Sequence, residues 1–237
     1  MTSKNGAASE LVISYLGLRR AVGIIGTSLP FVLVAGKWLL DGGGLQSSMS
    51  AYYYTSMRDV FVGGLCAIGV FLLSYRGYER ADDLAGNLAC VFAVGLALFP
   101  TSPPVGVSAT QALVGFAHLM FASAYFFTLA YFSLVLFRKT NPVKKMTERK
   151  KLRNVVYTAC GYTILACIGL LVVNVAFLKY SALQAIDPIF WLESAAVLAF
   201  GISWLTKGEA ILADVATHER PSRRLGSSGE RTRGVSH

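Results

Sequence analysis

The sequence predicts an all-α polytopic membrane protein, a bundle of six transmembrane helices with the N- and C-termini both cytoplasmic. Only 15% of its 237 residues are charged and 54% are hydrophobic, whereas soluble domains carry about 25% charged residues. The mean hydropathy is +0.53. The apolar residues form six long runs, and a bilayer core about 30 Å thick needs roughly 20 apolar residues as helix. Basic residues gather in alternate connections, which sets the orientation of the chain.

The six spans follow from the apolar runs in chain order. Pro30 removes a backbone hydrogen bond inside the first run and predicts a kink there. The third run is short for a span. Asp187 and Pro188 are expected to be the N-cap and the first residue of the sixth helix. The predicted spans are Ala21 to Leu40, Asp59 to Tyr75, Leu84 to Phe99, Leu113 to Phe137, Asn154 to Leu178, and Pro188 to Thr206.

The basic residues predict which side each connection lies on. All but three of the 22 Lys and Arg residues lie before the first span, in the second and fourth connections, or after the sixth span. The exceptions are Lys37, Arg58 and Lys179. Because positive charge marks the cytoplasmic side, these connections and both termini are expected inside. The predicted divisions are a cytoplasmic segment 1–20, which either lies along the inner surface or extends the first helix, a transmembrane domain 21–206, and a basic cytoplasmic tail 207–237 that is largely disordered from about residue 219.

The net charge of +9 would suit nucleic-acid binding, but its location between the spans favours a topological role, and no nucleic-acid partner is predicted. The most basic connection, from Arg138 to Arg153, is expected to contact anionic lipid headgroups, at about 1 kcal/mol for each basic residue near the surface.

The four cysteines lie inside apolar runs, without CxxC pairs or Cys/His clusters. Neither a disulfide framework nor a zinc site is therefore predicted, and the cofactor and the oligomeric state stay open.

Small residues indicate which helix faces meet, because they let backbones approach closely where lipid supplies no hydrophobic drive. One stripe is expected on the second span, at Gly63 and Ala67. Small or polar stripes are also expected on three further spans at Gly86, Cys90, Ala93 and Ala97, at Gln111, Gly115, His118, Ala122 and Tyr125, and at Cys160, Thr163, Cys167 and Asn174.

Polar residues inside a membrane are costly, so each requires a reason. Asp59, His118, Asn174 and Glu193 lie on four different spans. With a rise of 1.5 Å per residue, the last three lie about 8 Å below the outer ends of their helices, and Asp59 lies at the outer lip. We therefore expect one outward-facing polar pocket, roofed by the first outer loop. Its expected ligand-binding residues are Ser50, Tyr53, Tyr54, Thr55, Arg58, Asp59, His118, Asn174 and Glu193.

One stretch resembles a known group of proteins. The segment from Ser50 to Gly64 (SAYYYTSMRDVFVGG), together with Ala97 to Pro100 (ALFP), resembles uncharacterised bacterial six-helix membrane proteins that are distantly similar to the Frag/DRAM/Sfk group. The resemblance implies a prokaryotic cytoplasmic (inner) membrane and implies no particular reaction.

Two interpretations of the polar residues involve no chemical reaction. In a purely structural cluster, Asp59 pairs with Arg58 or a neighbour, and His118 hydrogen-bonds Glu193 to fix the helix register. In a binding or transport pocket, a carboxylate and an imidazole at one level bind a cation or relay protons, or the pocket takes a lipid or a small molecule.

A third interpretation is a membrane enzyme acting on a lipid or lipid-linked substrate. The candidate catalytic residues are His118, Asp59 and Glu193, with His118 as the general base held by one of the two carboxylates. The candidate nucleophiles are Ser50, Thr55 and Ser56. A metal held by Asp59, His118 and Glu193 is a variant of this interpretation, although no metal site is assigned.

Overall fold

A computed structural model describes residues 2–75, 79–139, 147–178 and 181–213, with the backbone alone for 2–14. Within these ranges the chain is helical and contains no strand, which confirms the all-α prediction for this part of the chain. The α-helices are α1 (Thr2–Leu40), α2 (Arg58–Leu73), α3 (Arg80–Leu98), α4 (Ala109–Tyr131), α5 (Glu148–Val173) and α6 (Pro188–Lys207). The short elements are the 3-10 helices η1 (Ser50–Tyr54) and η4 (Ala182–Ile186) and the π-helices η2 (Phe132–Leu136) and η3 (Asn174–Leu178), which continue α4 and α5.

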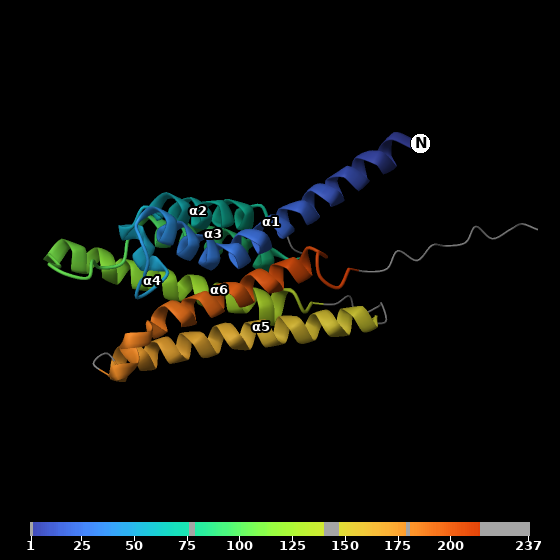
Figure 1. Cartoon of the computed structure of the whole chain (residues 1–237). Coiled ribbons are helices and arrows are strands. Elements are labelled where there is room, and N and C mark those ends of the chain that lie inside the picture. The colour runs from blue at the N-terminus through green and yellow to red at the C-terminus, as the bar shows by residue number, and fades with distance from the viewer. Residues whose placement is uncertain (1, 76–78, 140–146, 179–180, 214–237) are drawn as a thin grey trace, which may run out of the picture.

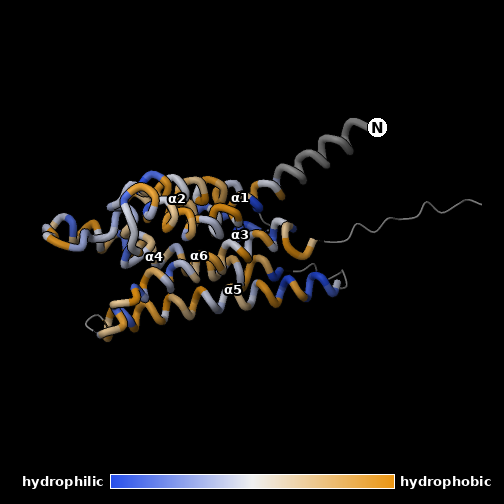
Figure 2. Tube along the Cα trace, in the orientation of Figure 1, coloured by the Kyte–Doolittle hydropathy of each residue, from blue (hydrophilic) through white to orange (hydrophobic). Residues whose placement is uncertain are grey.

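Five helices, namely α1, α3, α4 with η2, α5 with η3, and α6, are long and apolar enough to cross a membrane. Apolar residues run along the bundle, and the start of α5 is strongly hydrophilic (Figure 2). Large apolar side chains such as Phe31, Phe116 and Phe177 are exposed on the surface, where lipid would cover them. The composition and length of the helices are thus those of a membrane protein. The remaining predicted span, α2, has 16 residues and is about 24 Å long at 1.5 Å per residue.

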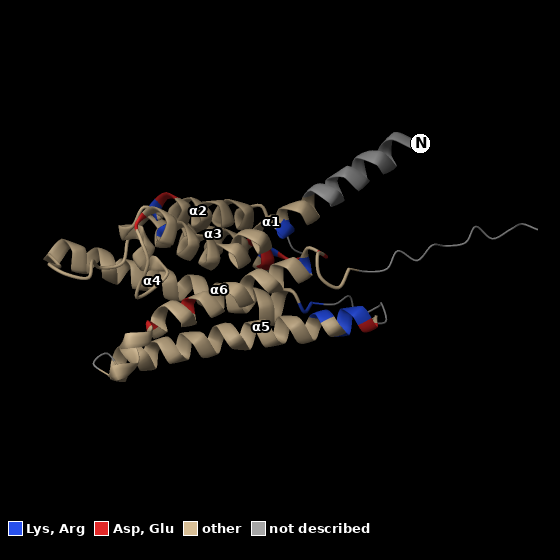
Figure 3. Ribbon diagram, viewed as in Figure 1, with Lys and Arg blue, Asp and Glu red and all other residues tan. Residues whose placement is uncertain are grey.

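The helices lie side by side, and successive helices run in opposite directions (Figure 1). α1 packs against α6 and α2, α3 lies between α2 and α4, and α5 lies between α4 and α6. Consequently α1 enters and α6 leaves at one end of the bundle. We call this the basic end, defined by Arg19, Lys150, Arg153 and Lys207 (Figure 3). The opposite end carries η1 and is called the η1 end.

An aromatic cluster fills the bundle near the basic end. The Trp204 ring on α6 lies 5.6 Å from the Tyr75 ring, 5.7 Å from Phe132 and 5.1 Å from Phe137, measured between centroids. Such pairs contribute about 0.5–1.5 kcal/mol each beyond their buried area. They tie the end of α2 and the π-helical end of α4 to α6.

Several predicted helix boundaries change. α1 runs through Pro30 as one helix that begins at Thr2, so the backbone of residues 2–20 extends the first helix. The short third run gains a turn because Glu79 and Asp82 form a reciprocal capping box before it. Asp187 is the N-cap residue of α6, as predicted, but it has a φ of 50° and its side chain makes no cap. The tail from about residue 219, and residues 140–146 of the most basic connection, lie outside the described residues.

The small-residue prediction is right for α3 and partly wrong for α2. A Cβ atom on Gly86 would lie 2.7 Å from the carbonyl oxygen of Leu72, and one on Gly69 would lie 3.3 Å from the Cβ of Ala93. A Cβ atom on Gly63 would meet nothing within 4 Å. The contact face of α2 is therefore the face of Gly69, not that of Gly63. On α5, Thr163 is exposed, whereas the other members of its predicted stripe are buried.

Candidate functional site

The predicted site residues divide between two places instead of forming one outward-facing pocket. An inner cavity of about 40 Å³ lies between the helices, and an outer depression of about 770 Å³ opens at the η1 end. The predicted residues at the inner cavity are Ser50, His118 and Glu193. Those at the outer depression are Tyr54, Thr55, Arg58 and Asp59.

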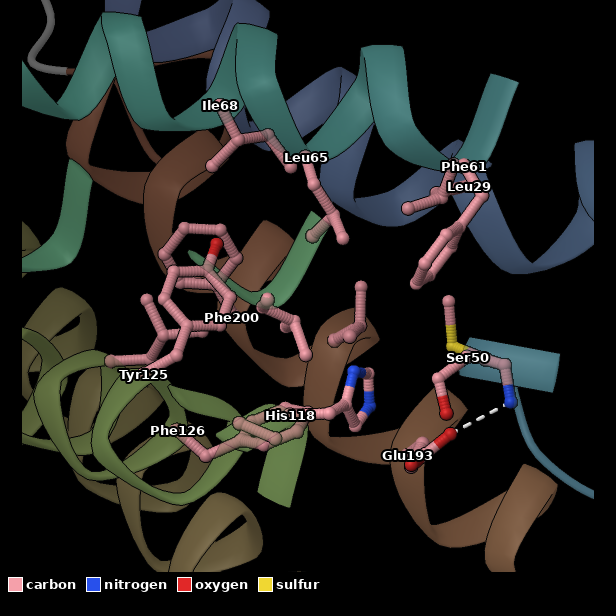
Figure 4. Close-up of a pocket in the computed structure, with 15 residues that line it drawn as sticks. Leu29, Ser50, Phe61, Leu65, Ile68, His118, Tyr125, Phe126, Glu193 and Phe200 are labelled. Carbon is pink, nitrogen blue, oxygen red and sulfur yellow. Dashed lines mark hydrogen bonds between the residues drawn. The ribbon is translucent and has the colours of Figure 1, made fainter. Parts of the chain in front are cut away.

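His118 projects from α4 into the inner cavity (Figure 4). Its Nδ1 lies 2.7 Å from the carbonyl oxygen of Phe99. Because a carbonyl oxygen can only accept, Nδ1 is the donor, and Nε2 of a neutral ring is left as an acceptor. Phe99 directly follows α3, where the last carbonyls have no partner within the helix. His118 therefore joins α4 to the end of α3, and the hydrogen bond to Glu193 expected of a structural cluster is not formed between these two described residues.

Glu193 lies on α6 and holds the connection that leads into η1. Its Oε2 accepts a hydrogen bond of 2.7 Å from the Met49 N–H, drawn in Figure 4, and the Ser50 N–H donates to the same carboxyl group. Hydrogen bonds from backbone N–H groups to a carboxylate are among the stronger ones in proteins. Glu193 thus fixes the position of η1, which carries Tyr53 and Tyr54 of the predicted site.

The inner cavity is too small for an organic ligand. One water needs roughly 10–15 Å³ of such space, so about 40 Å³ is room for about three or four waters. Apart from its predicted residues the lining is mainly apolar, with one further polar group, the buried Tyr125 hydroxyl, which has no hydrogen-bond partner in the part of the chain that the structure describes. A water between Tyr125 and His118 would satisfy that hydroxyl.

The small volume of the inner cavity argues against the enzyme interpretation. Ser50 shares the cavity with His118, and its hydroxyl lies 3.1 Å from that of Ser48, but the cavity has no room for a substrate. Thr55 and Ser56 line the outer depression instead. Of the candidate nucleophiles, Ser50 therefore lies beside the candidate base His118 but without space for a substrate, and Thr55 and Ser56 lie at a different site.

The outer depression combines two basic and two acidic side chains. Its lining residues are Lys37, Asp41, Gln46, Tyr54, Thr55, Ser56, Arg58, Asp59 and Pro104. Lys37 donates through Nζ to the carbonyl oxygens of Gly42 and Gly43, at 3.3 and 3.2 Å. Asp41 accepts from the Ser56 N–H at 3.0 Å, and hydrogen bonds from Ser56 hold the pKa of Asp41 below its usual range. Both of these charges therefore stabilise the loop itself.

Arg58 and Asp59 retain hydrogen-bonding capacity at the depression. Arg58 donates through Nε to the Tyr53 carbonyl oxygen at 2.8 Å, and its guanidinium carbon lies 4.8 Å from the Tyr53 ring centroid. Within the described residues, neither its two terminal nitrogens nor the Asp59 carboxylate makes a hydrogen bond or ion pair with the protein. The predicted pairing of Asp59 with Arg58 is therefore wrong. Asp59 lies in the first turn of α2.

Asn174 belongs to neither place. It is buried at the start of η3, where its Oδ1 accepts a hydrogen bond of 3.3 Å from Gln184 in η4. Its role is to fix the connection between α5 and α6.

Asp59 lines the depression while His118 and Glu193 line the cavity. The three candidate metal ligands are therefore not assembled, and within the described ranges no group of three or more His, Cys, Asp or Glu residues is placed to hold a metal.

Part of the depression was not predicted. Lys37, Asp41, Gln46 and Pro104 line it but were not among the expected ligand-binding residues. One signal was present: Asp41 lies directly between the first apolar run and a run of three glycines. An acid before a glycine-rich turn is a common loop-fixing arrangement.

Comparisons with protein-family models, with curated proteins and with solved structures find no match to this chain. The class of protein is therefore defined by its own features, which are a bundle of long apolar helices, a small inner cavity and an open polar depression.

Proposed function

We propose that this chain is a six-span protein of a bacterial cytoplasmic (inner) membrane that binds a small zwitterionic molecule, or the zwitterionic headgroup of a lipid, in its outer depression. One observation carries the proposal: the Asp59 carboxylate and the terminal guanidinium nitrogens of Arg58 are adjacent in the chain and line the same open depression. A ligand with an ammonium group and an acidic group would pair with both.

In the proposed topology α2 also spans the membrane, which brings the number of spans to six, and the basic end lies in the cytoplasm. α2 is about 24 Å long, but the chain reaches further toward the basic end because the Tyr75 N–H bonds the Leu72 carbonyl oxygen at 3.0 Å. The distribution of charge supports the orientation, since Arg19, Lys139, Lys150, Arg153 and Lys207 all lie toward one end (Figure 3).

Cysteine labelling tests this topology. In a chain whose four native cysteines are replaced by alanine, single cysteines at Ser102 and Ser181 should react with a membrane-impermeant thiol reagent added to intact cells. A cysteine at Thr147 should react only after the cells are opened, because the first two positions lie at the η1 end and the third precedes α5 at the basic end. Labelling of the Thr147 position in intact cells would show that the proposed orientation is wrong.

The charge balance of the depression favours a zwitterion over a simple anion or cation. Lys37 and Arg58 are matched by Asp41 and Asp59, so a ligand that carried charge of only one sign would face an unpaired group of its own sign. The two groups that do not stabilise the loop, Arg58 and Asp59, have charges of opposite sign. The enzyme interpretation is less well supported because His118 faces a cavity without room for a substrate.

Binding of phosphoethanolamine to the purified full chain in neutral detergent tests the proposed ligand class. It should raise the thermal midpoint, Tm, more than ethanolamine at the same concentration, since only the intact zwitterion can pair with both Asp59 and Arg58. Arg58→Gln and Asp59→Asn should each weaken its apparent affinity by roughly tenfold, about the contribution of one hydrogen bond to a charged group.

Both side chains are exposed, so neither substitution should change the Tm without ligand by more than a degree or two. Asp83→Asn, which removes a carboxylate at the start of α3 far from the depression, is the matched control and should bind phosphoethanolamine as the unmodified chain does. Equal binding by Asp59→Asn and the unmodified chain would contradict the proposal.

A further inference from the structure

Four cations from three helices meet at the basic end. Lys207 is the last residue of α6, and its positive electrostatic neighbours are Arg19 on α1 and Lys150 and Arg153 on α5. Asp82 is the acid that attracts it. Like charges held this close repel one another unless a counter-charge lies among them.

The neighbouring acidic residues, Asp82 and Glu209, form ion pairs with cations other than Lys207. Asp82 is 1% exposed and its Oδ1 lies 2.6 Å from Lys139 Nζ. Glu209 lies 3.8 Å from Arg153, near the limit for an ion pair. Lys207 makes no hydrogen bond or ion pair with any described residue, and its Nζ lies 5.3 Å from the Phe137 ring centroid. Among the described residues, Lys207 is therefore a cation without a paired counter-charge.

Buried donors without acceptors lie in the same region. The Nε of Arg19 and the Nε1 of Trp204 are buried and have no hydrogen-bond partner among the described residues. The two residues are connected through Tyr75, whose ring centroid lies 5.7 Å from the Arg19 guanidinium carbon and 5.6 Å from the Trp204 ring. Buried polar groups almost always have partners. Unsatisfied donors beside uncompensated positive charge are the complement of an anion with several acceptor oxygens.

We propose that the basic end is a phosphate-binding site between α1, α5 and α6, in which Arg19 and Lys207 bind the phosphate oxygens and Lys150 and Arg153 supply further positive charge. The phosphate belongs either to a phospholipid headgroup of the cytoplasmic leaflet or to free inorganic phosphate. The site goes beyond the general headgroup contact expected of the connection from Arg138 to Arg153, because Arg19 and Lys207 come from other helices. It is also independent of the outer depression, which lies at the opposite end.

Thermal unfolding of the full chain in neutral detergent, at constant ionic strength, tests the site with two probes. The Tm is measured with inorganic phosphate replacing chloride, and with phosphatidylglycerol added to the micelles. We expect at least one of them to raise the Tm. A response to inorganic phosphate identifies free phosphate as a ligand, and a response to phosphatidylglycerol alone identifies the lipid.

The effect of Lys207→Met on the Tm should depend on whether a phosphate probe is present. Without a phosphate probe the variant should have a higher Tm than the unmodified chain, since it removes an unpaired charge and keeps most of the side-chain volume. With the effective probe this advantage should shrink or reverse, because the apparent affinity should fall by roughly tenfold, the usual effect of losing one hydrogen bond to a charged group.

Lys151→Met is the matched control, since Lys151 is an exposed lysine on α5 that pairs with Glu148 at 2.7 Å outside the cluster. It should keep the full response to the effective probe. The proposal is overturned if neither phosphate nor phosphatidylglycerol raises the Tm, or if Lys207→Met responds to the effective probe as the unmodified chain does.

Discussion

Replacing Glu193 by methionine is expected to lower the free energy of unfolding by about 2–3 kcal/mol. The methionine side chain fills a similar volume but cannot accept the hydrogen bonds that the carboxyl group receives from the N–H groups of Met49 and Ser50. Each buried donor left without an acceptor costs about 1–3 kcal/mol. Reversible unfolding in mixed micelles measures the loss.

Glu193→Gln provides the comparison, because its amide oxygen can still accept from one backbone N–H. We expect it to lose about 1 kcal/mol or less. The methionine variant should also weaken phosphoethanolamine binding although Glu193 does not line the depression, because η1 would no longer be held in place for Tyr53 to support Arg58. Equal stability of the two variants would show that the hydrogen bonds to η1 contribute little.

Gly201→Ala is the second substitution with a large expected effect, a loss of about 2–3 kcal/mol in the free energy of unfolding. A Cβ atom at this position would lie 2.7 Å from the backbone nitrogen of Thr27 and 2.9 Å from the carbonyl oxygen of Gly23. Both are backbone atoms of α1 and cannot move aside as a flexible side chain can. The helices must separate instead, and such overpacking costs typically 1–3 kcal/mol.

The matched control is Gly63→Ala on α2, where a Cβ atom would meet nothing within 4 Å. Its expected effect is neutral or stabilising by up to about 1 kcal/mol, the difference in helix propensity between alanine and glycine. Both variants are compared by unfolding in the same mixed micelles. A Gly201→Ala variant as stable as the Gly63→Ala variant would mean that α1 and α6 do not approach as closely as the structure has them.

The helices themselves were largely predictable, because an apolar run and its bounding polar residues are properties of a local stretch of chain. The sixth helix begins at the predicted Pro188 and ends one residue beyond the predicted Thr206. The third helix was underestimated because its first turn, from Arg80 to Asp83, is polar and forms through the capping box of Glu79 and Asp82. A hydropathy pattern does not register a turn that is stabilised by hydrogen bonds.

The contacts between helices were much less predictable. The small residues of α3 were recognised as a packing face, but the close approach of α1 and α6 at Gly23, Gly26 and Gly201 was not. The first and last helices are neighbours in space and distant in sequence. A stripe of small residues indicates that a face packs closely, but not which helix it packs against.

By itself, the sequence determined the helical class, the apolar segments and the concentration of basic residues in particular connections, since composition and periodicity along the chain decide these. It also identified Asp59, His118, Asn174 and Glu193 as polar groups at a similar depth. Only the tertiary structure decided that His118 and Glu193 share a small inner cavity, that Asp59 and Arg58 face an open depression, and that Arg19 lies near Lys207. The depth of a residue in a helix follows from counting 1.5 Å per residue. The direction of its side chain and the residue that it meets depend on the rotation of each helix about its axis and on its neighbours, which the packing of the whole bundle sets.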